Sequence, residues 1–166
     1  MAVVLTELQF RAIIVTNINR NLDVYMKSKS DEIYVNDVLF TNDMKTLLLY
    51  PSEKKNKVYC VPNGVKEIGE ESFNNEYLEV LVLPYGLKSI VEYAFYCKNL
   101  LELYIPKSLS KVYLKAFCCC DAIKRVYFEG SEQEWNEIDF TLFNDTVKRA
   151  EIIFNYDYMS LNADLS

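Results

Sequence analysis

The sequence predicts an α/β-type solenoid: a right-handed coil, mostly β and irregular, with a parallel β-sheet along one face and a short capping helix near the C-terminus. The main observation is a repeat with a period of 22 residues. Its markers are three prolines and three phenylalanines at equal spacing: Pro62, Pro84 and Pro106, and Phe73, Phe95 and Phe117. A period of roughly 20 to 29 residues is typical of solenoids in which each coil contributes one strand to a common sheet.

Each repeat begins at a turn and ends on a strand. The three copies occupy residues 62–83, 84–105 and 106–128, and the third has one additional residue between Phe117 and Ile123. At the end of the first copy, Leu81 and Leu83 alternate with valines. We therefore expect the leucines to face the interior and the valines to face outward. One coil cannot bury such a stripe alone, whereas stacked coils form a continuous core.

Two further sets of residues are expected inside this core. The three phenylalanines should form a ladder through the middle of the stack. Ile68, Ile90 and Val112, which share the spacing of 22 residues, should line the opposite wall. Because the proline after each strand cannot donate a ladder hydrogen bond, it should end the strand and begin the next turn.

The proline after each strand, and the Ala-Phe pair with a cysteine shortly after it, resemble the repeats of the BspA-like leucine-rich-repeat family. The resemblance is best over residues 84–105 and 106–128. The first copy has Ser72 in place of the alanine and Asn75 in place of the cysteine. The resemblance implies a leucine-rich-repeat coil. It also implies attachment to host proteins or to other cells, usually from a surface location.

At 166 residues the chain is most simply one domain, residues 1–166,. We expect three parts: a degenerate N-terminal coil plus a hairpin over 1–55, regular repeats of 22–23 residues over 56–129, and a C-terminal cap over 130–166. Residues 10–15 have the apolar pattern of a repeat strand without the following proline. The Asn42-Asp43 turn between apolar runs predicts the hairpin.

The C-terminal part has the features of a cap, which a solenoid needs to shield its last coil. Ser131 and Glu134 have the spacing of a capping box at the start of a helix. Trp135 and Ile138 would lie about one turn apart and cover the last coil, and residues 151–154 predict one more strand. A terminal coil that stays exposed could instead pair with a second copy of the chain.

The composition argues against nucleic-acid binding and against a membrane span. The formal net charge is −6, whereas binding to phosphates requires clustered lysines and arginines. No segment has the roughly 18 consecutive apolar residues that cross a bilayer. The N-terminus lacks the basic start and apolar run of a secretory signal. Two locations therefore stay open: the cytoplasm, or the secreted or cell-surface location that the resemblance implies.

The residue types needed for common catalytic and metal sites are missing. The sequence has no histidine, and its five cysteines form no Cys-x-x-Cys pair. The commonest zinc sites and the Ser–His–Asp and Cys–His catalytic sites are therefore excluded. The carboxylates are scattered along the chain and do not indicate a pair that converges across a cleft. We expect no enzymatic activity, no cofactor and no metal.

Cys97 and Cys119 are expected at equivalent positions one coil apart. Neighbouring strands lie about 4.8 Å from each other, within the roughly 4.4–6.8 Å that separate the Cα atoms of a disulfide. A bridge is therefore allowed, and a pair of small buried thiols is the alternative. One of Cys118 and Cys120 is expected to be exposed.

The outward face of the predicted sheet is the candidate binding surface. The alternation places two residues of each coil there: Val80 and Val82, Glu102 and Tyr104, and Arg125 and Tyr127. Tyrosine and arginine are enriched among interface hot spots, although exposed tyrosine is also common in sheets. We therefore hypothesise a non-enzymatic protein-interaction module for cell-surface adhesion or host-protein binding. The alternative is an intracellular scaffold, or a spacer of a longer repeat array without its own ligand.

Overall fold

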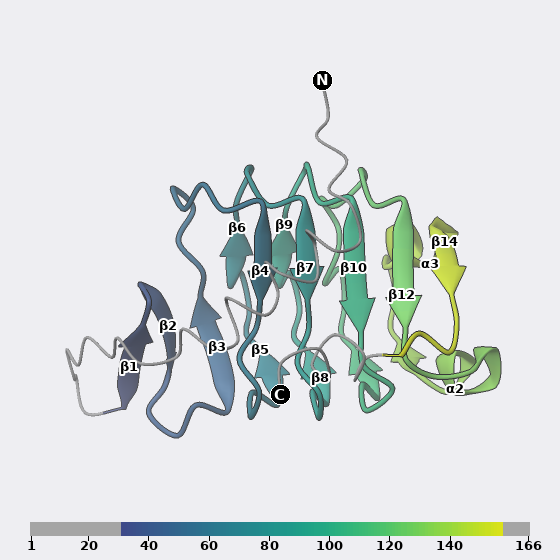
Figure 1. The fold of residues 1–166 in the computed structure, drawn as a ribbon, viewed down its shortest axis with the longest axis horizontal. Helices are drawn as coiled ribbons and strands as arrows, with labels where there is room; N and C mark the ends of the chain where they lie inside the picture. The colour runs from purple at the N-terminus through teal and green to yellow at the C-terminus, as the bar shows by residue number, and fades with distance from the viewer. Residues whose placement is uncertain (1–30, 158–166) are drawn as a thin grey trace.

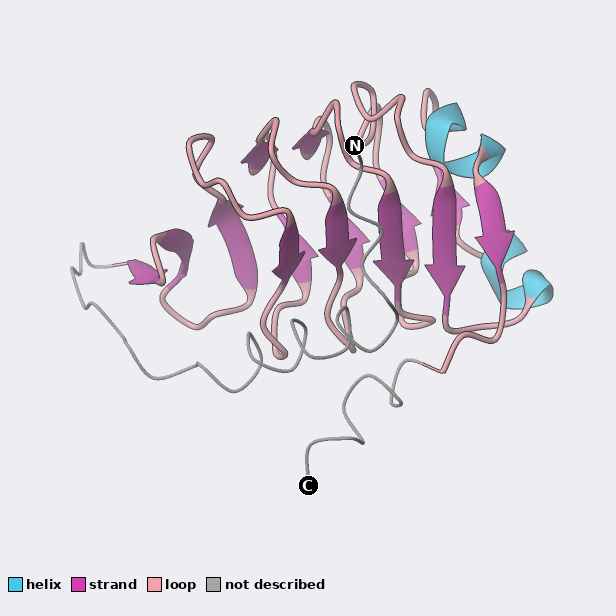
Figure 2. Ribbon diagram, turned by 45° about the horizontal axis from the view of Figure 1, so that its top comes forward, coloured by secondary structure: helices cyan, strands magenta, loops and turns pink. Residues whose placement is uncertain are grey.

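The computed structural model describes residues 31–157, which wind into a solenoid of about five turns (Figure 1). Three sheets line the sides of the coil, and two short helices lie at its C-terminal end (Figure 2). Most of the remaining residues form turns between the strands, because the chain passes from one side of the coil to the next every few residues. The predicted solenoid is therefore confirmed.

The five-stranded sheet forms the broad face in Figure 1, in the order β14-β12-β10-β7-β4. Its strands are β4 (Val58–Cys60), β7 (Val80–Val82), β10 (Glu102–Ile105), β12 (Arg125–Phe128) and β14 (Glu151–Ile153). All pairs are parallel and in register, so that Leu81 lies beside Leu103 and Leu103 beside Val126. These three side chains are fully buried. The predicted alternation on β7 is therefore confirmed, and so is the strand predicted over residues 151–154.

The opposite wall is also a sheet, which adds to the single sheet predicted from the sequence. It has seven strands in the order β1-β2-β3-β5-β8-β11-β13. The strands are β1 (Glu32–Val35), β2 (Val38–Thr41), β3 (Thr46–Leu49), β5 (Glu67–Ile68), β8 (Ser89–Ile90), β11 (Lys111–Val112) and β13 (Asp139–Phe140). Ile68, Ile90 and Val112 each end a strand of this wall and are fully buried, as predicted.

An antiparallel meander forms the N-terminal end of the described solenoid. Strands β2 and β3 form the predicted hairpin, and β1 pairs antiparallel with β2 as an additional strand. The carboxylate of Asp43 closes the turn by accepting hydrogen bonds from the Thr41 hydroxyl at 2.8 Å and the Lys45 amide at 3.0 Å. The degenerate coil predicted at residues 10–15 lies outside the described residues.

A ladder of aromatic rings fills the middle of the stack. The two-stranded sheet of β6 (Phe73–Asn74) and β9 (Phe95–Tyr96) sets its spacing. The ring centroids are 5.0 Å apart between Phe73 and Phe95 and 4.7 Å apart between Phe95 and Phe117. Tyr50, which the sequence did not indicate, extends the ladder with its centroid 5.2 Å from that of Phe73. The phenylalanine ladder is therefore confirmed and has one more member.

The position two or three residues after each ladder phenylalanine holds a polar side chain against the previous coil. The thiols of Cys97 and Cys120 lie 3.8 Å from the Phe73 carbonyl and 3.6 Å from the Phe95 carbonyl, respectively. Both cysteines are buried, whereas Cys119 is exposed. The prediction that Cys119 is equivalent to Cys97 is therefore wrong, because the additional residue of the third copy lies before Cys120. The ladder of buried thiols is present, with all five cysteines free.

The two helices cover the last coil. Helix α2 (Glu132–Asn136) begins with the predicted capping box, in which the Ser131 hydroxyl accepts from the Glu134 amide and the Glu134 carboxylate accepts from the Ser131 amide. Trp135 is buried against Phe128, with ring centroids 5.2 Å apart. Helix α3 (Asp145–Arg149) is a second short helix in this cap. The predicted capping helix is therefore confirmed, and Trp135 covers the last coil.

The hydroxyl of Ser72 is buried, and no hydrogen-bond partner among the described residues reaches it. The next two coils have Ala94 and Ala116 at this position, both fully buried. We predict that Ser72→Ala raises the free energy of unfolding by about 1 kcal/mol, because it removes an unpaired buried polar group. Urea denaturation followed by circular dichroism measures the change. Lower stability of the variant would show that the hydroxyl is paired.

Candidate functional site: the outer face of the five-stranded sheet

The outer face of the five-stranded sheet carries two rows of side chains that run across the coils. Each row forms because the strands pair in register and contribute alternate residues to this face. One row is Cys60, Val82, Tyr104, Tyr127 and Ile153, and the other is Val58, Val80, Glu102, Arg125 and Glu151. The six residues predicted as the binding surface are the central part of these rows, so the structure brings all six together.

Three tyrosines form a cluster on this face. The rings of Tyr104 and Tyr127 are stacked, with centroids 4.4 Å apart and planes 8° from parallel. Tyr156, which follows β14, packs edge-on against both, with centroids 5.3 Å and 5.2 Å away. Burial is the main cause that raises the pKa of Tyr104 and Tyr127, and the Glu102 carboxylate adds to both shifts. Both phenols therefore stay neutral at physiological pH.

The residues of this face differ in accessibility more than the sequence indicated. Val82 and Tyr104, which were expected to be exposed, have only 5% and 3% of their surface accessible. They belong to a small second core with Val58, so the expectation of exposure is wrong for these two residues. Val80 and Tyr127 are half-buried, and Arg125 is exposed. The part of the face that a partner can reach is therefore centred on β12.

An ion pair joins β12 to β10 beside the tyrosine stack. The guanidinium of Arg125 donates to the carboxylate of Glu102, which lies directly beside it in the sheet register. The Arg125 side chain is 48% exposed. The charge of Glu102 is the main cause that raises the pKa of the Arg125 guanidinium. A guanidinium has five N–H donors, so Arg125 has further donors available for a partner. The face thus combines a fixed aromatic surface with an oriented cation.

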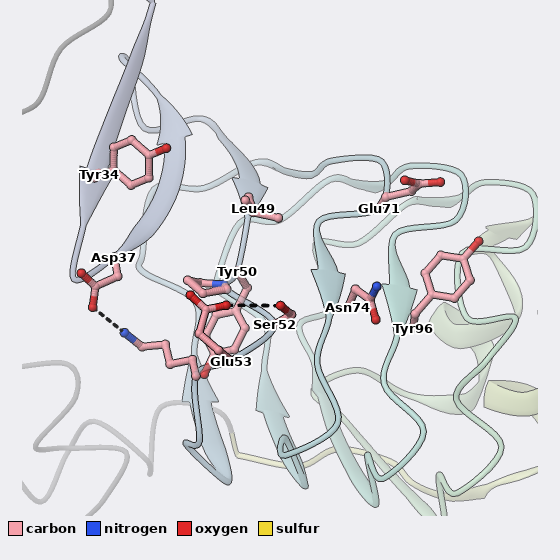
Figure 3. Close-up of a pocket in the computed structure, with 11 residues that line it drawn as sticks. Tyr34, Asp37, Leu49, Tyr50, Ser52, Glu53, Glu71, Asn74 and Tyr96 are labelled. Carbon is pink, nitrogen blue, oxygen red and sulfur yellow. Dashed lines mark hydrogen bonds and ion pairs between the residues drawn. The ribbon is translucent and has the colours of Figure 1, made fainter.

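A groove that the sequence analysis missed lies on the third side of the coil, between the β1–β2 hairpin and the two-stranded sheet (Figure 3). Its volume is about 780 Å³. The lining comprises Tyr34, Asp37, Leu49, Tyr50, Pro51, Ser52, Glu53, Lys54, Glu71, Asn74 and Tyr96. Tyr34 and Tyr96 lie on opposite sides of it (Figure 3). The groove therefore offers apolar and polar contacts to a ligand.

Beside the groove, two contacts link the turn between β1 and β2 to the loop that follows β3. The ammonium of Lys54 donates to the Asn36 carbonyl at 2.7 Å and pairs with the Asp37 carboxylate at 3.3 Å. Tyr34 and Leu49 are 39% and 44% exposed along the rim. A signal for part of this groove exists in the sequence, because Asn74 and Tyr96 each follow a ladder phenylalanine. No local sequence pattern indicates that the β1–β2 hairpin lies against the side of the coil that carries the two-stranded sheet.

Neither a cluster of metal ligands nor a membrane-spanning helix is found among the described residues. Within residues 31–157, no set of three or more cysteine, aspartate or glutamate side chains is arranged to hold a metal ion. The helices of this same region are all too short and polar to span a bilayer.

The architecture defines the class as a leucine-rich-repeat solenoid, and sequence comparison gives the family. Residues 52–164 match the BspA-type leucine-rich-repeat region, in six copies. The chain therefore belongs to the BspA-type leucine-rich-repeat family, whose repeats typically form non-enzymatic binding modules. No curated protein matches the chain significantly.

Three solved structures of bacterial leucine-rich-repeat or surface proteins are similar to the chain. A leucine-rich-repeat protein from Eubacterium ventriosum is 21% identical with a TM-score of 0.53, over 64% of this chain and 29% of that chain. A leucine-rich cell surface protein from Faecalibacterium prausnitzii is 20% identical, with a TM-score of 0.35 over 67% of this chain and 43% of that chain. The pneumococcal vaccine antigen PcpA is 17% identical, with a TM-score of 0.38 over 78% of this chain and 49% of that chain. The chain thus spans less than half the length of each, and the Eubacterium structure supports the fold.

Proposed function

We propose that this chain is a non-enzymatic protein-interaction module that holds a protein partner on the outer face of its five-stranded sheet. The partner class that we favour is a host protein or a protein on another cell, with the module acting in cell-surface adhesion. Membership of the BspA-type family and the accessible residues on β12 support this proposal. We assign no cofactor to the activity, because adhesion needs none.

The observation that carries the proposal is the stacked Tyr104–Tyr127 pair beside the Arg125–Glu102 ion pair. The stack and the sheet register hold the Tyr127 ring in place before any partner arrives. A side chain that is already ordered loses less conformational entropy on binding. Tyrosine and arginine are also the residue types most often found among binding hot spots. This part of the face therefore suits a specific protein contact.

Self-association through the terminal coils is a second way in which the chain could bind a protein. In the described part of the chain, β4 and β14 are the edge strands of the five-stranded sheet. Edge strands present unpaired backbone groups on which another chain can pair. Light scattering after size-exclusion chromatography at several concentrations tests this. A mass that stays at that of one chain at every concentration would exclude it.

We predict that Arg125→Ala combined with Tyr127→Ala weakens the binding of a matrix or surface protein by about tenfold or more, because it removes the two accessible hot-spot residues. The measurement is surface plasmon resonance of purified chain over immobilised extracellular-matrix proteins and surface glycans. Lys111→Ala combined with Tyr113→Ala is the matched control. It removes a cation and a tyrosine from the opposite wall, where the Lys111 ammonium lies 4.9 Å from the Tyr113 ring centroid.

The outcomes of this binding experiment distinguish an adhesion module from a structural scaffold or spacer. Saturable binding that is lost in the β12 variant and retained in the control supports an adhesion module that uses this face. Equal loss in both variants would contradict the assignment of the site. Absence of binding to every protein and glycan would favour the alternative of a structural scaffold or spacer without its own ligand.

A further inference from the structure

Two adjacent cysteines lie at the surface of the third coil, next to the additional residue that lengthens its turn. Cys118 is half-buried, Cys119 is exposed, and their sulfur atoms are 3.6 Å apart. Residues 114–119 form the turn that carries them. Neither thiol belongs to the aromatic ladder or to the outer sheet face. Their contact is therefore not explained by the packing of the coil.

We propose that Cys118 and Cys119 form a dithiol site that exchanges with the disulfides of small thiol compounds. This site lies on a different side of the coil from the proposed partner-binding face, and it is independent of that function. The ligand class is a low-molecular-weight disulfide, R–S–S–R. The product is a disulfide between the two adjacent cysteines.

The surroundings of the pair give a small ligand access. Cys119 lines a groove of about 480 Å³ together with Tyr77, Tyr96 and Lys98. Ser52, Glu53, Asn74 and Tyr96 also line the larger groove, so the two are continuous. Tyr96 comes from the preceding coil and faces the pair. Partial desolvation is the main cause that raises the pKa of the Tyr96 hydroxyl, and the adjacent Cys118 thiol is the second cause. An exposed sulfur beside aromatic rings is thus reachable from solvent through this groove.

The reaction proceeds by two successive exchanges. The Cys119 thiolate, formed by loss of its proton to solvent, attacks one sulfur of R–S–S–R, so that this S–S bond breaks and R–S⁻ leaves and is protonated. The Cys118 thiolate then attacks the Cys119 sulfur of the mixed disulfide, and the second R–S⁻ leaves and is protonated. The two cysteines lose two electrons and two protons, and the small disulfide is reduced to two thiols.

The geometry favours a reversible product. The sulfur atoms lie 3.6 Å apart and approach to the roughly 2.05 Å of an S–S bond in the second exchange,. The Cα atoms of adjacent residues are about 3.8 Å apart across a trans peptide. This is shorter than the roughly 4.4–6.8 Å of ordinary disulfides, so the product is strained. Strained and exposed disulfides are the easily reduced ones.

The other three cysteines serve as internal controls. Cys97 and Cys120 are buried, with their thiols against carbonyls of the preceding coil. Burial raises the pKa of Cys97 to about 11 and that of Cys60 to about 12, and it raises the pKa of Cys120 further. These thiols stay protonated in the folded chain. Cys119 has the one exposed thiol among the five cysteines, so exchange before unfolding is expected to begin there.

The experiment treats the folded full chain with glutathione disulfide and follows the intact mass and the modified peptides by mass spectrometry. Partial desolvation, then the Cys118 thiol, raises the pKa of Cys119, so a mildly alkaline buffer is used. We expect the wild-type chain to lose two hydrogens and to retain no glutathione. We expect Cys118→Ser to retain one glutathione on Cys119, because it has no second thiol to release it. Cys119→Ser should react about tenfold more slowly, because its remaining thiol is half-buried.

Two results would overturn the proposal. Wild-type chain that retains glutathione on Cys119 as fully as Cys118→Ser does would show that the two thiols do not act together. Folded chain in which Cys119 stays unmodified, while all five cysteines react in urea, would show that the site is closed to small disulfides. Circular dichroism of the two variants checks that each serine substitution leaves the fold intact.

Discussion

Replacing Phe95 by alanine is expected to lower the free energy of unfolding by about 4 kcal/mol, the cost of truncating a large, fully buried ring. Phe95 is the central ring of the ladder, with neighbours on both sides at centroid distances of 5.0 Å and 4.7 Å. Neighbouring rings cannot close the space from either side, since Phe73 is held in β6 and the Phe117 amide donates to the Asn144 side chain at 3.2 Å. The cavity therefore remains largely open. Urea denaturation monitored by circular dichroism gives the change.

Phe95→Leu is the matched control for this prediction. Leucine keeps most of the apolar volume and loses only the ring stacking, so a smaller cost of about 1.5 kcal/mol is expected. Equal and small losses in both variants would contradict the view that the ladder fills the core. An unchanged slope of the unfolding transition would show that both variants still unfold as one unit.

Asn75→Ala is expected to lower the free energy of unfolding by about 3 kcal/mol, since it leaves several partly buried backbone groups without the Asn75 side chain,. The Asn75 amide nitrogen donates to the carbonyls of Pro51, Ser52 and Lys54 at 3.0, 3.1 and 2.8 Å. Its oxygen accepts from the amides of Tyr77 and Leu78 at 2.8 and 2.9 Å. Asn75 thus fixes the loop before β4 against the next coil. Trypsin digestion should show faster cleavage at the lysines of that loop.

Asn75→Cys tests why this coil has an asparagine two residues after the ladder phenylalanine. The next two coils have Cys97 and Cys120 at the equivalent position. A thiol can donate to one carbonyl, as it does in those coils, and it cannot replace both functions of the amide. We expect stability between those of the wild type and Asn75→Ala. Wild-type stability of the cysteine variant would show that the loop is held by other contacts.

Residues that recur every 22 positions were predictable, because each of them has the same environment in every coil. The phenylalanine ladder, Leu81 and Leu83 in and directly after β7, and the aliphatic residues of the opposite wall are of this kind. The cap was also predictable, because Ser131 and Glu134 form a local motif. Errors arose where the period is broken. The residue added in the third coil shifts the buried cysteine from the expected Cys119 to Cys120.

Other features depend on contacts between distant residues and leave no local pattern. The alternation along β10 places Tyr104 on the outer face, as predicted. No pattern in the sequence indicated that Tyr156 packs against its ring there. Tyr50 joins the ladder from a position outside the regular repeat. Glu71, Tyr93 and Lys115 have positive φ angles of 49°, 55° and 53°, one in each coil. None of these three positions holds a glycine or an asparagine, so the sequence did not reveal them,.

The face centred on β12 is the proposed site of a protein partner, and the groove is the other surface that could hold it. The most direct test measures the dissociation constant of one partner for two double variants. Arg125→Ala with Tyr127→Ala changes the sheet face, and Tyr34→Ala with Tyr96→Ala changes the groove. We predict affinity at least about tenfold weaker for the first variant and unchanged for the second. Loss confined to the groove variant would contradict the claim and move the binding site to the other side of the coil.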